Sequence, residues 1–219
     1  MNLGKLIALY RSRSLDIRKP YFCKDDELIE FFQEAQDEAA TRARLLFDKT
    51  APFTEIPVAK GETMLPLSPK IVEIRRAALV DVEGKEWLIV ARDRDDMDRE
   101  RPGWRTETRR PDAFFHDDTG LELNAIPETD YTLKLEVYRL PLRPFSTEEH
   151  APEIAEHHHR HLLDWVLYRA YEKEDAELFN PAKSKESLER FERHFGRRKT
   201  ANMRKRQQAS RPHRNVSYS

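Results

Sequence analysis

Histidines are the residues whose spacing in this sequence comes nearest to a chemical site. His157, His158 and His159 form a run, and His161 lies four residues after His157. Side chains at that spacing share one helix face, so this pair could hold one metal ion. A zinc site needs further ligands, and the sequence has no HExxH motif and no pair of cysteines. The alternative is a mostly solvated run with His158 or His161 bonded inside an interface. We predict no metal and no cofactor.

The sequence offers little for nucleophilic or phosphate chemistry. Its one cysteine, Cys23, follows two aromatic residues in a predicted loop, which favours a buried structural thiol over a reactive one. The GxSxG, GxxxxGK[ST] and GxGxxG patterns are absent. Acidic residues between positions 93 and 101 alternate with arginines, a pattern typical of exposed ion pairs. We therefore predict no catalytic residue. Hydrolysis that a chelator and His161→Ala both abolish would revive an enzymatic interpretation.

Charge is unevenly distributed along the chain. Charged residues make up 36% of the sequence, against about 25% in an ordinary globular domain. The last 23 residues, 197–219, contain no acid, whereas the other 196 residues carry a net charge of −9. The eight basic residues of this tail are Arg197, Arg198, Lys199, Arg204, Lys205, Arg206, Arg211 and Arg214. An acidic body with a basic tail suits docking on another acidic surface better than clamping DNA.

Two interpretations of the tail stay open. Its lysines and arginines could release counterions from DNA and so give salt-sensitive binding. Only Tyr218 lies among them as an aromatic residue, so a base-stacking platform is not expected. The other interpretation, which we favour, is a segment that orders only on a protein partner.

Helical periodicity marks both ends of the chain. We predict helices over about 2–13 and 26–48, the second with Asp25 as its N-cap, because apolar residues recur there at three- and four-residue spacing. A third helix is expected from Pro152 to about residue 174. Asn180 and Pro181 are typical of a cap and a first helical residue, and Gly196 is placed to end the last helix.

The middle of the chain changes to strand-like alternation between about residues 53 and 140. Turn signals at Glu83-Gly84 and Asp118-Thr119-Gly120 separate short β-branched segments, and a period of two runs from Tyr131 to Leu140. This spacing predicts six or so short antiparallel strands, in a small sandwich or an open barrel. The predicted fold class is α+β: a helical bundle of the N- and C-terminal helices, an inserted small antiparallel β domain, and an extended basic C-terminal tail.

The corresponding domains are a helical domain over 1–52 and 145–196, a β domain over 53–144 and an arm over 197–219. A single cysteine permits no internal disulfide, which fits a reducing compartment. The N-terminus lacks the apolar core of a signal peptide, and no apolar run nears the roughly 20 residues of a membrane span. We expect synthesis in a cytoplasm and no membrane partner.

Several motifs, taken in order, resemble one family. The first runs from Pro20-Tyr21-Phe22 through Asp25-Asp26-Glu27-Leu28 to Ala39–Leu46. Pro102-Gly103-Trp104-Arg105 follows in mid-chain. The last group lies between Arg139 and Gly196 and includes Arg139–Pro144, His161-Leu162-Leu163-Asp164-Trp165 and Phe191–Gly196. Together they resemble the head-to-tail adaptor (connector, or tail tubular A-like) proteins of podovirus-type bacteriophages. The family commonly has Trp-Ser where this chain has Cys23-Lys24, so a serine cap is missing.

The resemblance implies a virion protein of the neck, made in the host cytoplasm. It implies a homo-oligomeric ring, typically of twelve copies, between the portal protein and the tail nozzle or tail tubular protein, with genomic DNA passing through its channel. Helices would form the ring, and the arm, including Tyr218, would reach the portal. Trp104, His161 and Arg42 are candidates for the subunit interface, although local packing explains Trp104 equally well. The alternative function is a DNA-binding accessory protein that uses the basic tail.

Overall fold

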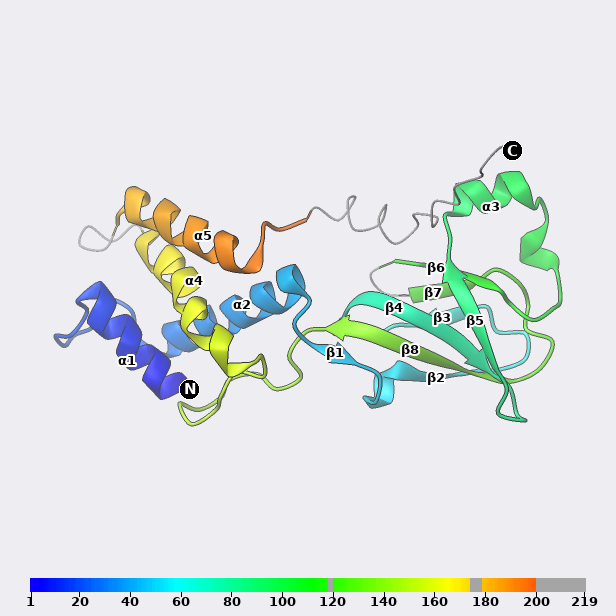
Figure 1. Cartoon of the computed structure of the whole chain (residues 1–219), viewed down its shortest axis with the longest axis horizontal. Coiled ribbons are helices and arrows are strands. Elements are labelled where there is room, and N and C mark those ends of the chain that lie inside the picture. The colour runs from blue at the N-terminus through cyan, green and yellow to red at the C-terminus, as the bar shows by residue number, and fades with distance from the viewer. Residues whose placement is uncertain (118–119, 174–178, 200–219) are drawn as a thin grey trace, which may run out of the picture. The chain divides into compact units, whose positions relative to one another are not determined.

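The computed structural model describes residues 1–117, 120–173 and 179–199. These residues divide into two compact units. The helical unit consists of Met1–Phe47 and Tyr138–Arg198, and the β unit consists mainly of Asp48–Val137 (Figure 1). No helix in the described part of the chain is both long enough and apolar enough to cross a membrane.

Four α-helices form the described part of the helical unit. They are α1 (Leu3–Ser14), α2 (Asp25–Ala43), α4 (His159–Tyr171) and α5 (Pro181–Phe195), with a short 3₁₀ turn, η3 (Glu156–His158), before α4. Their apolar stripes meet in one core that includes Leu6, Phe32, Leu162 and Phe191, all of them fully buried. Helix α4 is buried on most sides because α1, α2 and α5 all pack against it.

Local signals set some helix ends and fail at others. As predicted, the Asn180 side chain accepts a hydrogen bond from Lys183 N at 3.0 Å, Pro181 opens α5 and Gly196 ends it. The predicted N-cap of α2 is wrong: Lys24 takes that position without a side-chain cap bond, because the Asp25 carboxylate binds Arg11 instead. Helix α2 also ends at Ala43, earlier than predicted, because Arg44 turns to a positive φ of 54°.

Among the residues that the structure describes, one eight-stranded sheet dominates the rest of the fold. Its order is β1-β8-β4-β5-β6-β7-β3, and β2 pairs with β8 beside that path. The strands are β1 (Phe47–Asp48), β2 (Glu55–Val58), β3 (Met64–Pro66), β4 (Ile71–Val80), β5 (Glu86–Ala91), β6 (Ala113–His116), β7 (Gly120–Leu123) and β8 (Tyr131–Arg139). The sheet is curled (Figure 1). Its buried core includes Leu79, Ile89, Leu133 and Val137.

The predicted fold class is therefore wrong. The molecule is a mixed α+β protein built around one large curled sheet with five α-helices in the described residues, and not a helical bundle with a small antiparallel insertion. Strand β8 has the predicted alternation, but it pairs with the distant β2 in the register Ile56↔Leu133. Strands β5 and β6 are parallel, because helix α3 (Arg94–Glu100) and η2 (Trp104–Thr106) lie on the connection between them. Alternation reports which faces are buried and cannot report which strands pair.

Candidate partner-binding site at the start of the C-terminal arm

Arg42, in the last turn of α2, anchors a group of charges in the helical unit. Its side chain is only 5% exposed, and its Nε donates to Glu38 Oε2 at 2.8 Å. The guanidinium carbon lies 5.1 Å from the Trp165 ring centroid and 5.2 Å from that of Phe191. Arg42 thus joins α2 to both α4 and α5 through a desolvated cation–π contact.

Two carboxylates connect Arg42 to the segment that follows α5. Glu192 Oε1 lies 3.7 Å from Arg42 Nη1, and Glu192 Oε2 lies 3.4 Å from Arg197 Nε. Glu38 Oε1 in turn lies 3.3 Å from Arg198 Nη1. We call these five residues the exit cluster, because the arm leaves the helical unit there.

The exit cluster has a buried side and an exposed side. Arg197 and Arg198 are 89% and 63% exposed, so each of their ion pairs contributes less than about 1 kcal/mol. Arg42 is buried, and its Nη1 has no hydrogen-bond partner within the described residues. The buried arginine therefore holds the two carboxylates in place, while the two arm arginines can leave at little cost.

A group of histidines lies where η3 and the first turn of α4 meet the end of α5. His158 Nδ1 is 3.0 Å from His194 Nε2, and the rings of His161 and His194 stack at 3.5 Å. Burial, and then the neighbouring histidines, lower the pKa of His158; the same causes lower the pKa of His194. In the described part of the chain, no group of three or more His, Cys, Asp or Glu is placed to hold a metal ion. The rings of His158, His161 and His194 therefore pack against one another, and burial favours the neutral form of His158 and His194.

The predicted interface residues fall in different places. Arg42 lies in the exit cluster and His161 in the histidine stack, both in the helical unit. Trp104 is 1% exposed in the β unit, where it packs on Phe115 and donates from Nε1 to Asp98 at 2.7 Å. The Trp104 ring is thus packed within its own chain, and no observation tests any of the three as a subunit contact.

The predicted arm is described only at its start. Arg197, Arg198 and Lys199 belong to the described residues. The remaining predicted arm residues lie outside them: Arg204, Lys205, Arg206, Arg211, Arg214 and Tyr218. Sequence reasoning missed Glu38 and Glu192 altogether. The four-residue spacing from Glu38 to Arg42 was the one signal available, since such pairs meet on a helix face.

A family model described as SU10 adaptor protein matches residues 1–216. The chain belongs to this adaptor family. The match covers almost the whole sequence and confirms the resemblance to a phage head-to-tail adaptor. A comparison with curated proteins found no match.

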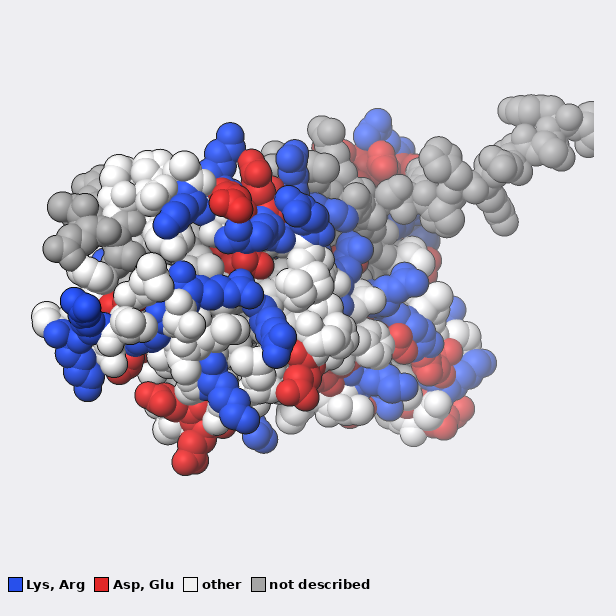
Figure 2. Space-filling model, turned by 60° about the vertical axis from the view of Figure 1, so that its left-hand side comes forward, with Lys and Arg blue, Asp and Glu red and all other residues white. Residues whose placement is uncertain are grey.

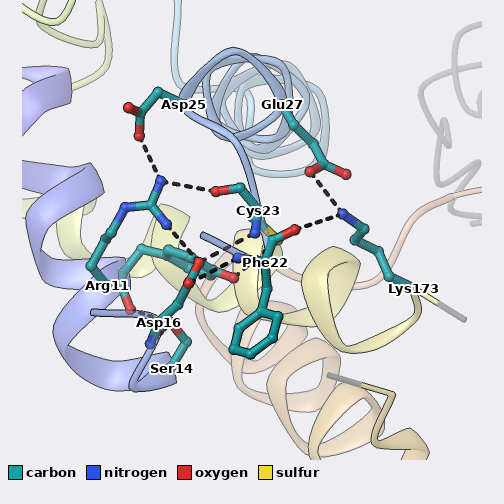
Figure 3. Close-up of polar contacts among 9 residues, drawn as sticks. Arg11, Ser14, Asp16, Phe22, Cys23, Asp25, Glu27 and Lys173 are labelled. Carbon is teal, nitrogen blue, oxygen red and sulfur yellow. Dashed lines mark hydrogen bonds and ion pairs between the residues drawn. The ribbon is translucent and has the colours of Figure 1, made fainter. Parts of the chain in front are cut away.

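This adaptor contains a second arginine network, which fixes the loop between α1 and α2 (Figure 3). Arg11 donates to Asp16 at 2.5 Å, to the Cys23 carbonyl at 2.9 Å and to Asp25 at 2.6 Å. The Asp16 carboxylate, fully buried, also accepts from the backbone N–H groups of Phe22 and Cys23. We call Arg11, Asp16, Cys23 and Asp25 the loop network. Every charge in it has a partner, so it holds the loop in one conformation.

Cys23 takes part in this network as a buried structural thiol, as predicted. It accepts a hydrogen bond from Tyr10 Oη at 3.2 Å, and burial raises the pKa of the thiol. Lys173, just after α4, donates to the Phe22 carbonyl at 3.1 Å and to Glu27 at 2.9 Å (Figure 3). The loop is therefore fixed to α1, α2 and the end of α4 together.

Proposed function

We propose that this adaptor is a ring subunit of the virion neck, which joins the portal to the tail nozzle or tail tubular protein around the DNA channel. The observation that carries the proposal is the adaptor family match over residues 1–216. The family is one of structural phage proteins. In this proposal about twelve copies form the ring through their helical units, and the subunits are made in the host cytoplasm before assembly.

The arm over 197–219 is the proposed contact with the portal. It carries eight basic residues and no acid, so it matches a partner surface rich in carboxylates. At its start, Arg197 and Arg198 bind Glu192 and Glu38 only through exposed ion pairs. Exchange of these carboxylates for those of the portal would cost little, since the two sets of contacts are alike.

Deletion of residues 200–219 tests this role directly. We expect a protein with unchanged circular dichroism that binds purified portal at least about tenfold more weakly, because the arm supplies most of the charge complementarity. The matched control is Lys183→Ala with Lys185→Ala, which removes two exposed cations from α5 instead. Unchanged attachment to portal-containing heads after the deletion would contradict the arm assignment.

The second candidate is a DNA-binding accessory protein, which the basic composition of residues 197–219 favours. A salt titration discriminates, because binding to phosphates weakens steeply with ionic strength. Micromolar or tighter binding to duplex DNA at physiological salt, lost on deletion of 200–219, would favour it. DNA-binding surfaces commonly show a basic stripe, whereas the face in Figure 2 shows basic and acidic side chains interspersed.

A further inference from the structure

The loop between α1 and α2 exposes apolar side chains although it is rigidly held. Leu15 is 77% exposed and Ile17 is 64% exposed, on either side of the buried Asp16. Leu15 also adopts a positive φ of 62°, which residues other than glycine adopt uncommonly. The loop network that fixes Asp16 thus imposes this conformation on its neighbours. Exposed apolar residues on a rigid support are typical of a protein-binding surface.

Three exposed cations lie on the same loop and the last turn of α1. Arg13, Arg18 and Lys19 are all exposed, and within the described residues none of them forms an ion pair. We call Arg13, Leu15, Ile17, Arg18 and Lys19 the cationic knob. A partner surface that complements the cationic knob would combine carboxylates with some apolar area.

The chain itself offers a surface of that kind on the outward side of α2. Asp26 and Glu30, four residues apart and both exposed, lie opposite the buried stripe that contains Leu28, Phe32 and Ala35, and we call these two the carboxylate row. Glu34 follows at the same spacing but faces α4, where its Oε2 accepts a hydrogen bond from Trp165 Nε1 at 3.3 Å. Glu34 lies 3.5 Å from Arg169, whereas Asp26 and Glu30 form no ion pair within the described residues. Like charges four residues apart destabilise a helix, so a partner that brings cations to this row would relieve the repulsion. Ile29, half-buried, adds apolar surface beside the row.

We infer that the cationic knob of one copy binds the carboxylate row of α2 on a second copy. Arg18 and Lys19 would pair with Asp26 and Glu30, while Leu15 and Ile17 would cover Ile29. Donor and acceptor surfaces are different parts of the molecule, so the contact is heterologous and can repeat from copy to copy until a ring closes. This inference deepens the proposed function and relies on it for the ring.

A charge swap tests the contact in the full-length chain by sedimentation velocity over a concentration series at low salt. We expect concentration-dependent association of the native protein. Arg18→Glu with Lys19→Glu should raise its apparent dissociation constant about tenfold or more, and so should Asp26→Lys with Glu30→Lys. Association should return when the two double variants are mixed in equal amounts, and also when all four substitutions share one chain.

Matched controls separate this contact from general charge effects and from misfolding. Arg160→Glu with Lys185→Glu makes the same change in net charge as Arg18→Glu with Lys19→Glu, at exposed positions elsewhere on the helical unit, and should leave association unchanged. Circular dichroism should be unchanged in every variant. A native chain that remains monomeric at every concentration would overturn the inference, and so would a swap that does not restore association. Portal binding is measured separately. If deletion of 200–219 abolishes portal binding but the charge swap does not restore association between copies, the proposed function stands and only this contact is rejected.

Discussion

Two arginine networks in the helical unit differ in how completely their charges are paired. Arg11 in the loop network has two carboxylates and a carbonyl within hydrogen-bond distance, and its partner Asp16 is fully buried. Arg42 in the exit cluster is also buried, but its Nη1 has no hydrogen bond to any residue that the structure describes, and its carboxylates are shared with exposed arm residues. The first arrangement fixes a conformation. The second holds the start of the arm through exposed ion pairs, which can be broken at little cost.

The largest effect is expected from Asp16→Ala, which removes the centre of the loop network. It leaves the buried Arg11 with one carboxylate fewer and leaves two backbone N–H groups without an acceptor, so we expect a loss of about 3–5 kcal/mol in the free energy of unfolding. Denaturant unfolding measures it. Asp16→Asn, which keeps an acceptor oxygen but no charge, should have a free energy of unfolding between those of the native protein and Asp16→Ala. A loss below about 1 kcal/mol for Asp16→Ala would show that the loop is not held by this network.

Arg42→Ala should have the next largest effect. It removes the packing of the guanidinium on Trp165 and Phe191 and the main counter-charge of Glu38 and Glu192. We expect a loss of about 2 kcal/mol in the free energy of unfolding, smaller than for Asp16 because the two glutamates remain partly solvated. Arg42→Lys keeps the charge but not the planar stacking, so it should recover only part of the loss. Full recovery by lysine would mean that stacking contributes little.

Acidification should weaken the histidine stack beside the exit cluster. Because the folded protein lowers the pKa of His158 and His194, it binds fewer protons there than the unfolded chain, in which the pKa of histidine is about 6.5. Their contribution is complete above pH 6.5 and is lost as the pH falls through the lowered folded values. We expect the melting temperature to fall by a few degrees between pH 7 and 5. His194→Gln should reduce this pH dependence of the melting temperature. An unchanged pH dependence in the variant would show that His194 does not cause it.

The smallest effect is expected from Arg197→Ala combined with Arg198→Ala. Both side chains are exposed, so the free energy of unfolding should change by less than about 0.5 kcal/mol. The same variant should weaken portal binding measurably, since it removes two of the eight arm cations. A destabilisation as large as that of Arg42→Ala would show that the exposed side of the exit cluster stabilises the fold as much as the buried side does.

The sequence by itself determined the features that depend on a few neighbouring residues. Asn180, Pro181 and Gly196 marked the ends of α5, and the alternation from Tyr131 to Val137 marked a strand with one buried face. It also showed the basic arm and the ordered motifs that identify the family, since composition and motif order need no coordinates. The capping and alternation signals act over a few neighbouring residues, which is the range over which backbone conformation and capping are decided.

Only the tertiary structure decided which segments meet. It pairs β8 with β2, makes β5 and β6 parallel, and turns Asp25 from the expected helix cap into a partner of Arg11. It also brings Arg42 beside Glu192, 150 residues later, and Glu38 beside Arg198, 160 residues later. Such contacts depend on how whole faces pack against each other, because a carboxylate binds whichever cation the folded chain places beside it. That placement is a property of the complete core and not of any local spacing.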